Sequence, residues 1–216
     1  GKNEGLLYDG ENPGGEEGKT KVTGLVVAIA LVILLIAGGG YYFYNYMYLP
    51  DQNYRQAVAL AEEGKYEEAY AAFTALKDYG KAAEQAYKVK QMIGYRHVNN
   101  KEYDKALEVF ASIGDQEGVA TCKTAQAEDL LSRQKFEEAA ALYEEMGNAE
   151  GVNRCKYAQA SALLSQGMEA EAYAAFKELG DYSDAAGKAV QLKNAAQQRA
   201  YAELAKIDLL HISIYS

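Results

Sequence analysis

The chain has few residues that interrupt helices and few that cross-link small domains. Its 216 residues include two prolines, two cysteines and no tryptophan. Proline breaks helix interiors, whereas the abundant Ala, Glu, Lys, Leu and Gln lose little conformational freedom in a helix. Two cysteines do not make the disulfide framework of a small secreted domain, and no C-x-x-C pair indicates zinc or redox chemistry. The composition therefore predicts a folded, all-α protein.

Positive charge is also scarce. The formal net charge is -9, and after residue 49 there are 19 basic residues against 26 acidic ones. Because phosphate contacts require clustered Lys and Arg, we expect no nucleic-acid partner. His97 and His211 are the two histidines, and neither has a neighbouring ligand pattern. Phosphate-binding glycine loops, G-x-S-x-G and H-E-x-x-H are missing, so we expect no catalytic residues, no metal, no cofactor and no enzyme.

Charged residues are absent from one long segment. Residues 22–50 include "VTGLVVAIALVILLIAGGG" and comprise 29 consecutive uncharged positions. Roughly 20 apolar residues suffice to cross a bilayer. An aromatic cluster follows the apolar run, where amphipathic rings favour the headgroup layer: Tyr41, Tyr42, Phe43, Tyr44, Tyr46 and Tyr48. The segment predicts a single-pass transmembrane helix over 22–49 with an aromatic belt, in contact with the lipid bilayer.

Two other interpretations agree less well with the sequence of the run. A cleaved signal peptide would use Ala37, Gly38 and Gly39 as its processing site, but five acidic residues precede the run, and a discarded segment needs no aromatic belt. A buried core helix seldom runs this long without a charge. We therefore favour an anchor in the cell membrane.

Positive charge near the run predicts its orientation. Lys19 and Lys21 precede the run, while the nearest basic residue after it is Arg55. The positive-inside rule then places the N-terminus in the cytoplasm and the rest of the chain outside it. Residues 1–21 are rich in Gly and acidic side chains and predict a flexible tail. Residues 206–216, "KIDLLHISIYS", depart from the helical rhythm and predict a separate tail that forms a strand, a cap or an edge.

A repeat organises residues 51–205. "GKYEEAYAAF" at 64–73 and "GMEAEAYAAF" at 167–176 lie 103 positions apart. An alanine followed four residues later by an aromatic recurs at intervals of 37, 33 and 33: Ala69 and Phe73, Ala106 and Phe110, Ala139 and Tyr143, Ala172 and Phe176. Apolar residues at helical spacing predict a short helix in each unit, and a turn and a second helix follow. Because one helix pair cannot cover its own apolar face, we expect the pairs to stack.

Details of the units follow from the same spacing. Asp115 and Asp181 stand where N-caps are wanted, and breaks at Gly64, 99–100, 133–135 and Gly167 end the second helices. The first interval carries four extra residues, which predict a second helix one turn longer. Cys122 and Cys155 are 33 apart and are interpreted as small core residues in equivalent places.

The repeated stretches resemble the second half of a tetratricopeptide repeat (TPR). The matching positions are Gly64, Tyr66, Glu67, Glu68, Ala69 and Phe73; Tyr103, Ala106 and Phe110; Phe136, Glu137, Glu138, Ala139 and Tyr143; and Gly167, Ala172 and Phe176. The family's tryptophan, its leucine-glycine step and its proline are missing, so the chain resembles a divergent member. The layout is similar to bacterial single-pass proteins in which a short cytoplasmic part, often a zinc ribbon, precedes the anchor. The resemblance implies a TPR-like α-solenoid of antiparallel helix pairs.

The resemblance also implies a concave groove lined by the first helix of each pair. The positions carried over to this chain are Tyr54, Val58, Lys88, Gln91, Tyr95, Thr124, Glu128, Arg154, Tyr157, Ser161, Asn194 and Gln198. Tyrosines among hydrogen-bonding groups suit an extended peptide. We expect a membrane-anchored interaction scaffold that binds a peptide or protein partner. The alternatives are a structural spacer, a self-associating scaffold in the form of a homo-oligomer, or an ordinary surface.

Overall fold

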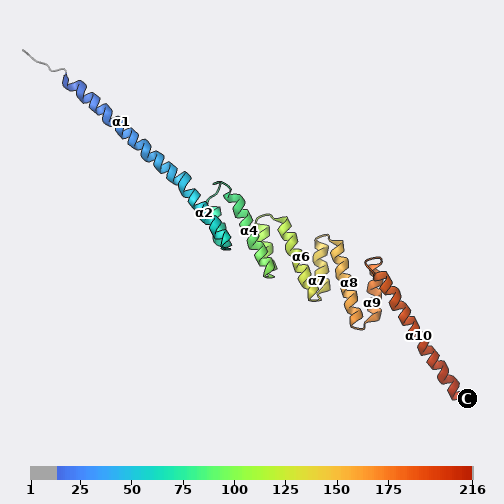
Figure 1. Cartoon of the computed structure of the whole chain (residues 1–216). Helices are drawn as coiled ribbons and strands as arrows, with labels where there is room; N and C mark the ends of the chain where they lie inside the picture. Colours follow the sequence, from blue (N-terminus) through green and yellow to red (C-terminus); the bar gives the residue numbers. More distant parts are fainter. Residues whose placement is uncertain (1–13, 216) are drawn as a thin grey trace, which may run out of the picture. The chain divides into compact units, whose positions relative to one another are not determined.

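The computed structural model describes the backbone of residues 14–215 and the side chains of residues 22–208 (Figure 1). Over residues 14–215 every regular element is a helix and no strand is present. The predicted all-α class is therefore confirmed. The chain divides into two units, residues 1–86 and residues 87–216, and each is described here by itself.

In the first unit, three helical segments follow one another without a break. They are α1 (Gly14–Phe43), a π-helical turn η1 (Tyr44–Tyr48) and α2 (Leu49–Glu62). Helix α3 (Tyr66–Ala75) packs against α2. The expected tail boundary at residue 21 lies inside α1, and residues 1–13 of that tail lie outside the described residues.

The π-helical turn has a cause in the sequence. Pro50 stands at the start of α2 and has no amide hydrogen for the carbonyl one turn earlier. Directly before it, the Leu49 amide donates to the carbonyl of Tyr44, five residues back instead of four. Such π-turns interrupt the regular hydrogen-bond ladder and are a recognised cause of helix bending. The helix thus passes through the proline at the position where the apolar run ends.

The second unit is a succession of helices joined by short turns. Helix α4 (Ala82–Asn99) crosses the boundary between the units, and α5 (Tyr103–Ser112), α6 (Gln116–Ser132), α7 (Phe136–Glu145), α8 (Ala149–Ser165), α9 (Glu169–Leu179) and α10 (Ala185–Tyr215) follow it. From α5 onward, each helix packs against the next one along the chain. The unit therefore consists of successive helices that pack as neighbouring pairs.

The cores of these pairs repeat one arrangement. Ala106 and Phe110 of α5 pack with Cys122 of α6, and Ala139 and Tyr143 of α7 pack with Cys155 of α8. All six side chains are buried, which confirms both cysteines as core residues. Burial raises the pKa of both thiols. The helix opposite each ring carries a glycine so that it can approach closely. A Cβ on Gly118 or Gly151 would lie 2.2 or 2.4 Å from that ring.

The helix ends also follow the repeat. Gly64, Lys101, Gln134 and Gly167 have φ values of +77°, +61°, +59° and +79° and lie at intervals of 37, 33 and 33. Each begins the turn to a following short helix, where a left-handed residue closes the preceding helix. The predicted breaks at Gly64, 133–135 and Gly167 are therefore found, and the break predicted at 99–100 has its left-handed residue at Lys101.

Asp115 caps α6 by accepting from the Gly118 amide, at 2.9 Å between nitrogen and oxygen. Asn148 caps α8 in the same way, accepting from the Gly151 amide at 2.9 Å. The prediction that Asp181 is an N-cap is wrong, because α10 begins four residues later, at Ala185.

The predicted lengthening of the second helix is also wrong. Helix α4 has 18 residues and α6 has 17, so the extra residues of the first interval lie mainly in the turn before α4. That turn and the one before α10 each contain a tyrosine, Tyr79 and Tyr182, whose ring packs inward. The Tyr182 turn also explains why α10 begins at Ala185 and not near Asp181. The turn that directs the Tyr182 ring inward occupies the residues before Ala185.

The predicted change of structure at residue 206 is not seen, since α10 continues as one helix to Tyr215. Residues 200–210, "AYAELAKIDLL", contain no Gly or Pro that would end a helix. The apolar residues that suggested alternation are equally compatible with helical spacing.

Candidate functional site

Three of the predicted groove residues, Thr124, Glu128 and Arg154, come together where α6 and α8 pack against α7. Their centre is a hydrogen-bonded group formed by Glu128 of α6, Tyr143 of α7 and Arg154 of α8. The Tyr143 hydroxyl donates to the Glu128 carboxylate at 2.6 Å. The Arg154 guanidinium donates to the same carboxylate and, at 2.6 Å, to the Tyr143 oxygen. The three residues are called the α6–α8 cluster below.

The three residues of the α6–α8 cluster shift one another's pKa values. The hydrogen bond from Tyr143, followed by that from Arg154, lowers the pKa of the Glu128 carboxyl. Burial and the carboxylate together raise the pKa of the Tyr143 hydroxyl to about 12. The carboxylate raises the pKa of Arg154. The cluster is therefore a charged pair bridged by a neutral phenol, with the Arg154 side chain 46% exposed.

A small pocket of about 210 Å³ opens beside this cluster. The α6–α8 cluster and Thr124, Asn148, Glu150 and Gly151 line it. Thr124 donates to the backbone oxygen of Ala120 at 2.9 Å, and Glu150 accepts from the Tyr182 hydroxyl at 2.9 Å. The pocket is thus lined by two carboxylates, a guanidinium and neutral polar side chains.

Tyr157, one helical turn beyond Arg154 on α8, is held by a second group. Its hydroxyl donates to Asp184 and accepts from Lys188, whose ammonium lies 4.6 Å from the centre of the Tyr157 ring. These contacts lower the pKa of Asp184 and raise that of Lys188. The Tyr157 ring lies edge-on to Phe176, with 5.5 Å between centroids. Its position is therefore fixed by the α9–α10 pair.

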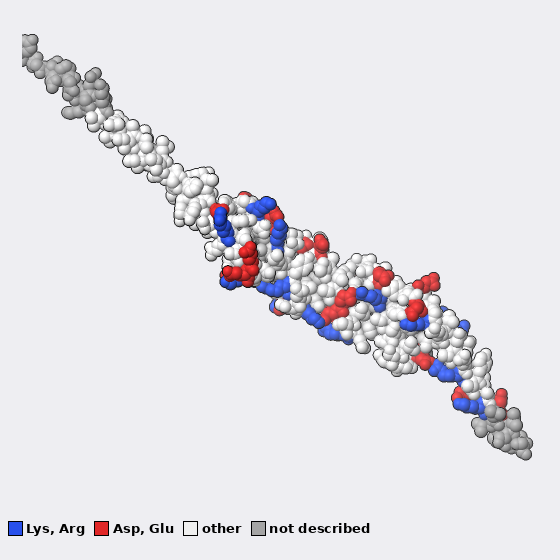
Figure 2. Space-filling model, viewed as in Figure 1, with Lys and Arg blue, Asp and Glu red and all other residues white. Residues whose placement is uncertain are grey.

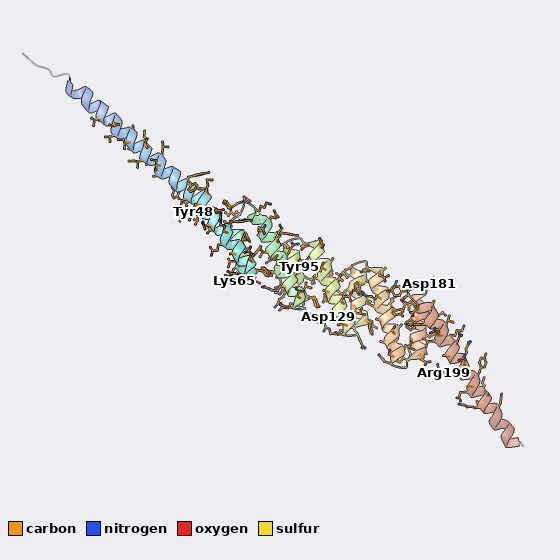
Figure 3. The ribbon with its side chains drawn as sticks, in the orientation of Figure 1. Tyr48, Lys65, Tyr95, Asp129, Asp181 and Arg199 are labelled. Atoms are coloured by element: carbon orange, nitrogen blue, oxygen red, sulfur yellow. The ribbon has the colours of Figure 1, made fainter. Side chains whose placement is uncertain are left out.

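Nearer the N-terminus of this unit, two predicted residues contact the core of the α5–α6 pair. Gln91 donates to the Asp115 carboxylate at 2.7 Å, and the ring of Tyr95 lies 5.0 Å from that of Phe110. Burial raises the pKa of Tyr95, which is labelled in Figure 3. Lys88 is exposed on the same helix. Gln91 and Tyr95 therefore have structural contacts whether or not they meet a ligand.

In the first unit, Tyr54 has the surroundings that Tyr157 has in the second. Its ring lies 5.5 Å from Phe73 and 6.4 Å from Tyr79. Tyr54 and Tyr157 are 103 residues apart, as are their ring partners. The repeated decapeptide is thus accompanied by a repeated aromatic contact.

The last predicted residues lie apart from the α6–α8 cluster. Asn194 and Gln198 are exposed on α10, at positions equivalent to Ala160 and Leu164 of α8. On α8 those positions pack against the following helix pair. Ser161 is half-buried, and its hydroxyl oxygen has no hydrogen-bond partner. Val58 is half-buried on α2.

Sequence reasoning missed the tyrosine and the salt bridges that hold these groups. Tyr143 stands where the other three repeats have Phe. This difference in the sequence could have identified Tyr143 as a member of the site. Asp129, which is labelled in Figure 3, is buried and accepts hydrogen bonds from Lys101, at 2.5 Å, and from Arg133. The hydrogen bond from Lys101 lowers the pKa of Asp129. Lys101 and Asp129 are 28 residues apart, so no local pattern indicated this pair. Over the described part of the chain, no group of three His, Cys, Asp or Glu residues is placed to hold a metal ion.

Comparison with known proteins gives no match, since no protein-family model, no curated protein and no solved structure is significantly similar to this chain.

Proposed function

We propose that the chain is a membrane-anchored scaffold that binds a peptide or protein partner on the α6–α8 face of a TPR-like solenoid. The observation that carries the proposal is the pocket beside the α6–α8 cluster, because it gathers predicted groove residues from successive helix pairs. The packing of each helix on the next supports an open stack, in which such pockets recur along one face. The proposal is for binding and not for catalysis, with no nucleic-acid partner.

The length of the apolar segment supports the anchor. The helix Val22–Glu62 contains a window of mean hydropathy 2.7 that is 0% buried. Residues 22–40 would span about 28 Å as a helix, close to the roughly 30 Å of a hydrocarbon core. In Figure 2 the repeat helices carry blue and red atoms, while the described part of α1 is white. We therefore place residues 22–40 in the hydrocarbon core.

The aromatic residues and Pro50 support the position of the membrane boundary. Rings of the belt stack on one another, as for Tyr42 and Tyr46 at 4.8 Å between centroids. Pro50 leaves a backbone carbonyl without its helical donor, and such a group is costly in hydrocarbon and inexpensive in water. Residues 41–50 therefore suit the hydrated headgroup layer. The sequence's charge bias gives the proposed orientation, with the repeat domain outside the cytoplasm.

Binding on the α6–α8 face would use groups of two kinds. Half-exposed rings such as Tyr157 offer apolar contact, and Thr124, Asn148 and Glu150 offer hydrogen bonds to the backbone of an extended peptide. Arg154 has donors beyond those used within the cluster, because a guanidinium carries five N–H groups. A partner can thus add contacts without breaking those already made.

A structural spacer or a self-associating scaffold is the second candidate. The observation that favours it is the mutual satisfaction of Glu128, Tyr143 and Arg154. A group whose members bond one another across α6, α7 and α8 stabilises the stack and has no requirement for a ligand. On this view the tyrosines hold helices together.

Photo-crosslinking of the full-length chain in its native membrane distinguishes the two candidates. A photoreactive residue replaces Thr124 beside the pocket and, as a matched control, Glu171, which is exposed on α9. The scaffold proposal expects one discrete adduct with another protein from position 124, reduced by Arg154→Ala, and none from 171. An adduct with twice the mass of the chain would favour self-association. Equal labelling from both positions, or none from 124, would contradict partner binding.

A further inference from the structure

Three consecutive glycines lie within α1 without a packing reason. Gly38, Gly39 and Gly40 lie in the helix, and a Cβ built on any of them meets no atom within 4 Å. Gly118 and Gly151, in contrast, lie beneath aromatic rings. Each glycine in a helix costs about 1 kcal/mol relative to alanine, because its unfolded backbone is freer. The triplet therefore weakens this part of α1 with no close contact in return.

A second disturbance of the same helix begins within four residues. In the π-turn the Leu49 amide donates to Tyr44 and not to Asn45, and Pro50 donates to no carbonyl. The Asn45 side chain donates to the backbone oxygen of Tyr41 at 2.9 Å, so it competes for a carbonyl of the helix ladder. Proline, paired glycines and π-turns are the usual causes of helix kinks, and all three kinds of feature occur within residues 38–50.

Stiffer segments lie on both sides. Residues 25–37 form a helix with no glycine or proline, and α2 is held by packing against α3. Tyr54 of α2 contacts Phe73 of α3, which fixes the helix after the proline. The weak segment therefore joins the apolar span to the first helix pair.

We propose that residues 38–50 form a hinge that lets the first helix pair tilt relative to the membrane span. This goes beyond partner binding, and its reference to a bilayer rests on the proposed anchor. A hinge of this kind lets a scaffold present its face at several angles to the membrane surface. It is built from missing hydrogen bonds and missing side chains, and alanine restores both.

Distances between two spin labels in the full-length chain, reconstituted in phosphatidylcholine nanodiscs, test the hinge. The labels are attached to cysteines at Ala30 and Gln56, both exposed and on opposite sides of the segment. A straight helix would hold these positions about 39 Å apart. Cys122 and Cys155 are 0% exposed, and the chain without introduced cysteines serves as the labelling blank.

The wild-type chain is expected to give a broad distribution with distances shorter than the straight-helix value. Replacing Gly38, Gly39, Gly40 and Pro50 by alanine is expected to roughly halve its width and to centre it near the straight-helix distance, about 39 Å. Gly24→Ala is the matched control, since Gly24 also has no neighbour within 4 Å, and it should leave the width unchanged.

A narrow wild-type distribution near the straight-helix distance would overturn the hinge, as would equal widths in the wild type and the alanine variant. Relaxation of the Ala30 label by oxygen or by a water-soluble nickel chelate reports separately on the anchor. If the chelate reaches Ala30, the membrane proposal fails, while the distance widths still decide whether the segment bends.

Discussion

Helices α8 and α10 occupy equivalent places in successive pairs and differ in what covers their outer face. Both present a small buried residue to the preceding helix, Cys155 on α8 and Ala189 on α10. On its outer face α8 has Ala160, Leu163 and Leu164, which pack against α9 and α10. The equivalent residues of α10 are exposed and amide-bearing: Asn194, Gln197 and Gln198. The outer faces of the two helices therefore differ at these three positions.

Helix α6 shares the outer-face pattern of α8. Its outer face carries Ala127, Leu130 and Leu131, which pack against the following pair. An alanine and two leucines thus recur on α6 and α8, whereas α4 has Gly94, His97 and Val98 at the equivalent positions and also packs against the α5–α6 core. Repeat arrays end in polar faces because an apolar end would recruit further copies. On α6, α8 and α10 these three positions are therefore apolar where another pair packs and polar where the helix face is exposed.

The largest expected effect comes from giving α8 the outer face of α10. Leu163→Gln with Leu164→Gln removes two apolar contacts and buries two amides against α9. We expect the free energy of unfolding to fall by about 3 to 4 kcal/mol. Urea denaturation measures this loss, and hydrogen exchange should show α9 opening first. Gln197→Ala with Gln198→Ala is the control, expected to change stability by less than about 0.5 kcal/mol. Equal losses in both variants would show that the face has no special role.

The second effect concerns the inner face, where α8 has Gly151 and α10 has Ala185. Gly151→Ala places a Cβ 2.4 Å from the Tyr143 ring and should lower the unfolding free energy by about 2 to 3 kcal/mol. Gly187→Ala, on α10 with no neighbour within 4 Å, should raise it by about 0.5 to 1 kcal/mol. Thermal denaturation compares the two signs. A stabilising Gly151→Ala would refute the close approach of α7 and α8.

The reverse exchange is expected to give α10 an apolar outer face through which copies of the chain associate. Asn194→Ala with Gln197→Leu and Gln198→Leu gives α10 the pattern of α8. We expect the full chain in detergent to associate at least about tenfold more tightly than the wild type, a gain of roughly 1.4 kcal/mol. Analytical ultracentrifugation measures this shift. Unchanged sedimentation over the whole concentration range would show that three apolar residues are not sufficient.

The smallest expected effect separates the turns before α7 and α9. Gln134 and Gly167 hold equivalent left-handed positions, at φ +59° and +79°. Because a side chain is strained there, Gln134→Gly should stabilise the chain by about 0.5 to 1 kcal/mol. Gly167→Gln should destabilise it by a similar amount. Chemical denaturation of both variants checks the opposite signs, and equal signs would contradict the equivalence of the two turns.

Sequence patterns predicted the helix pairs because alanine and aromatic residues recur with strong helical spacing. They did not predict the turn lengths, because the inward packing of Tyr79 and Tyr182 depends on tertiary contacts. One additional residue before α10 shifts the equivalence of its positions by one, which is about 100° around a helix. Asn194 and Gln198 were assigned to the groove by that shift, and the structure places them on the outer face of α10.

The candidate site was predictable only in part. Glu128 and Arg154 were named from repeat positions, but their junction at Tyr143 required knowledge of how α6, α7 and α8 pack. The pair formed by Asp129 and Lys101 joins residues far apart in sequence and carries no periodic signal. Spacing thus indicates which face a residue occupies, and three-dimensional packing determines which residue it meets.

The proposed function requires the helix pairs to form an open stack. Spin labels at Ala120, Asn153 and Gly187, equivalent positions on α6, α8 and α10, measure this directly in the full-length chain. Since neighbouring helices pack about 8 to 10 Å apart, we predict roughly 20 Å between the first two labels and roughly 40 Å between the first and third. A distance from α6 to α10 no longer than that from α6 to α8 would indicate a closed bundle and contradict the stack.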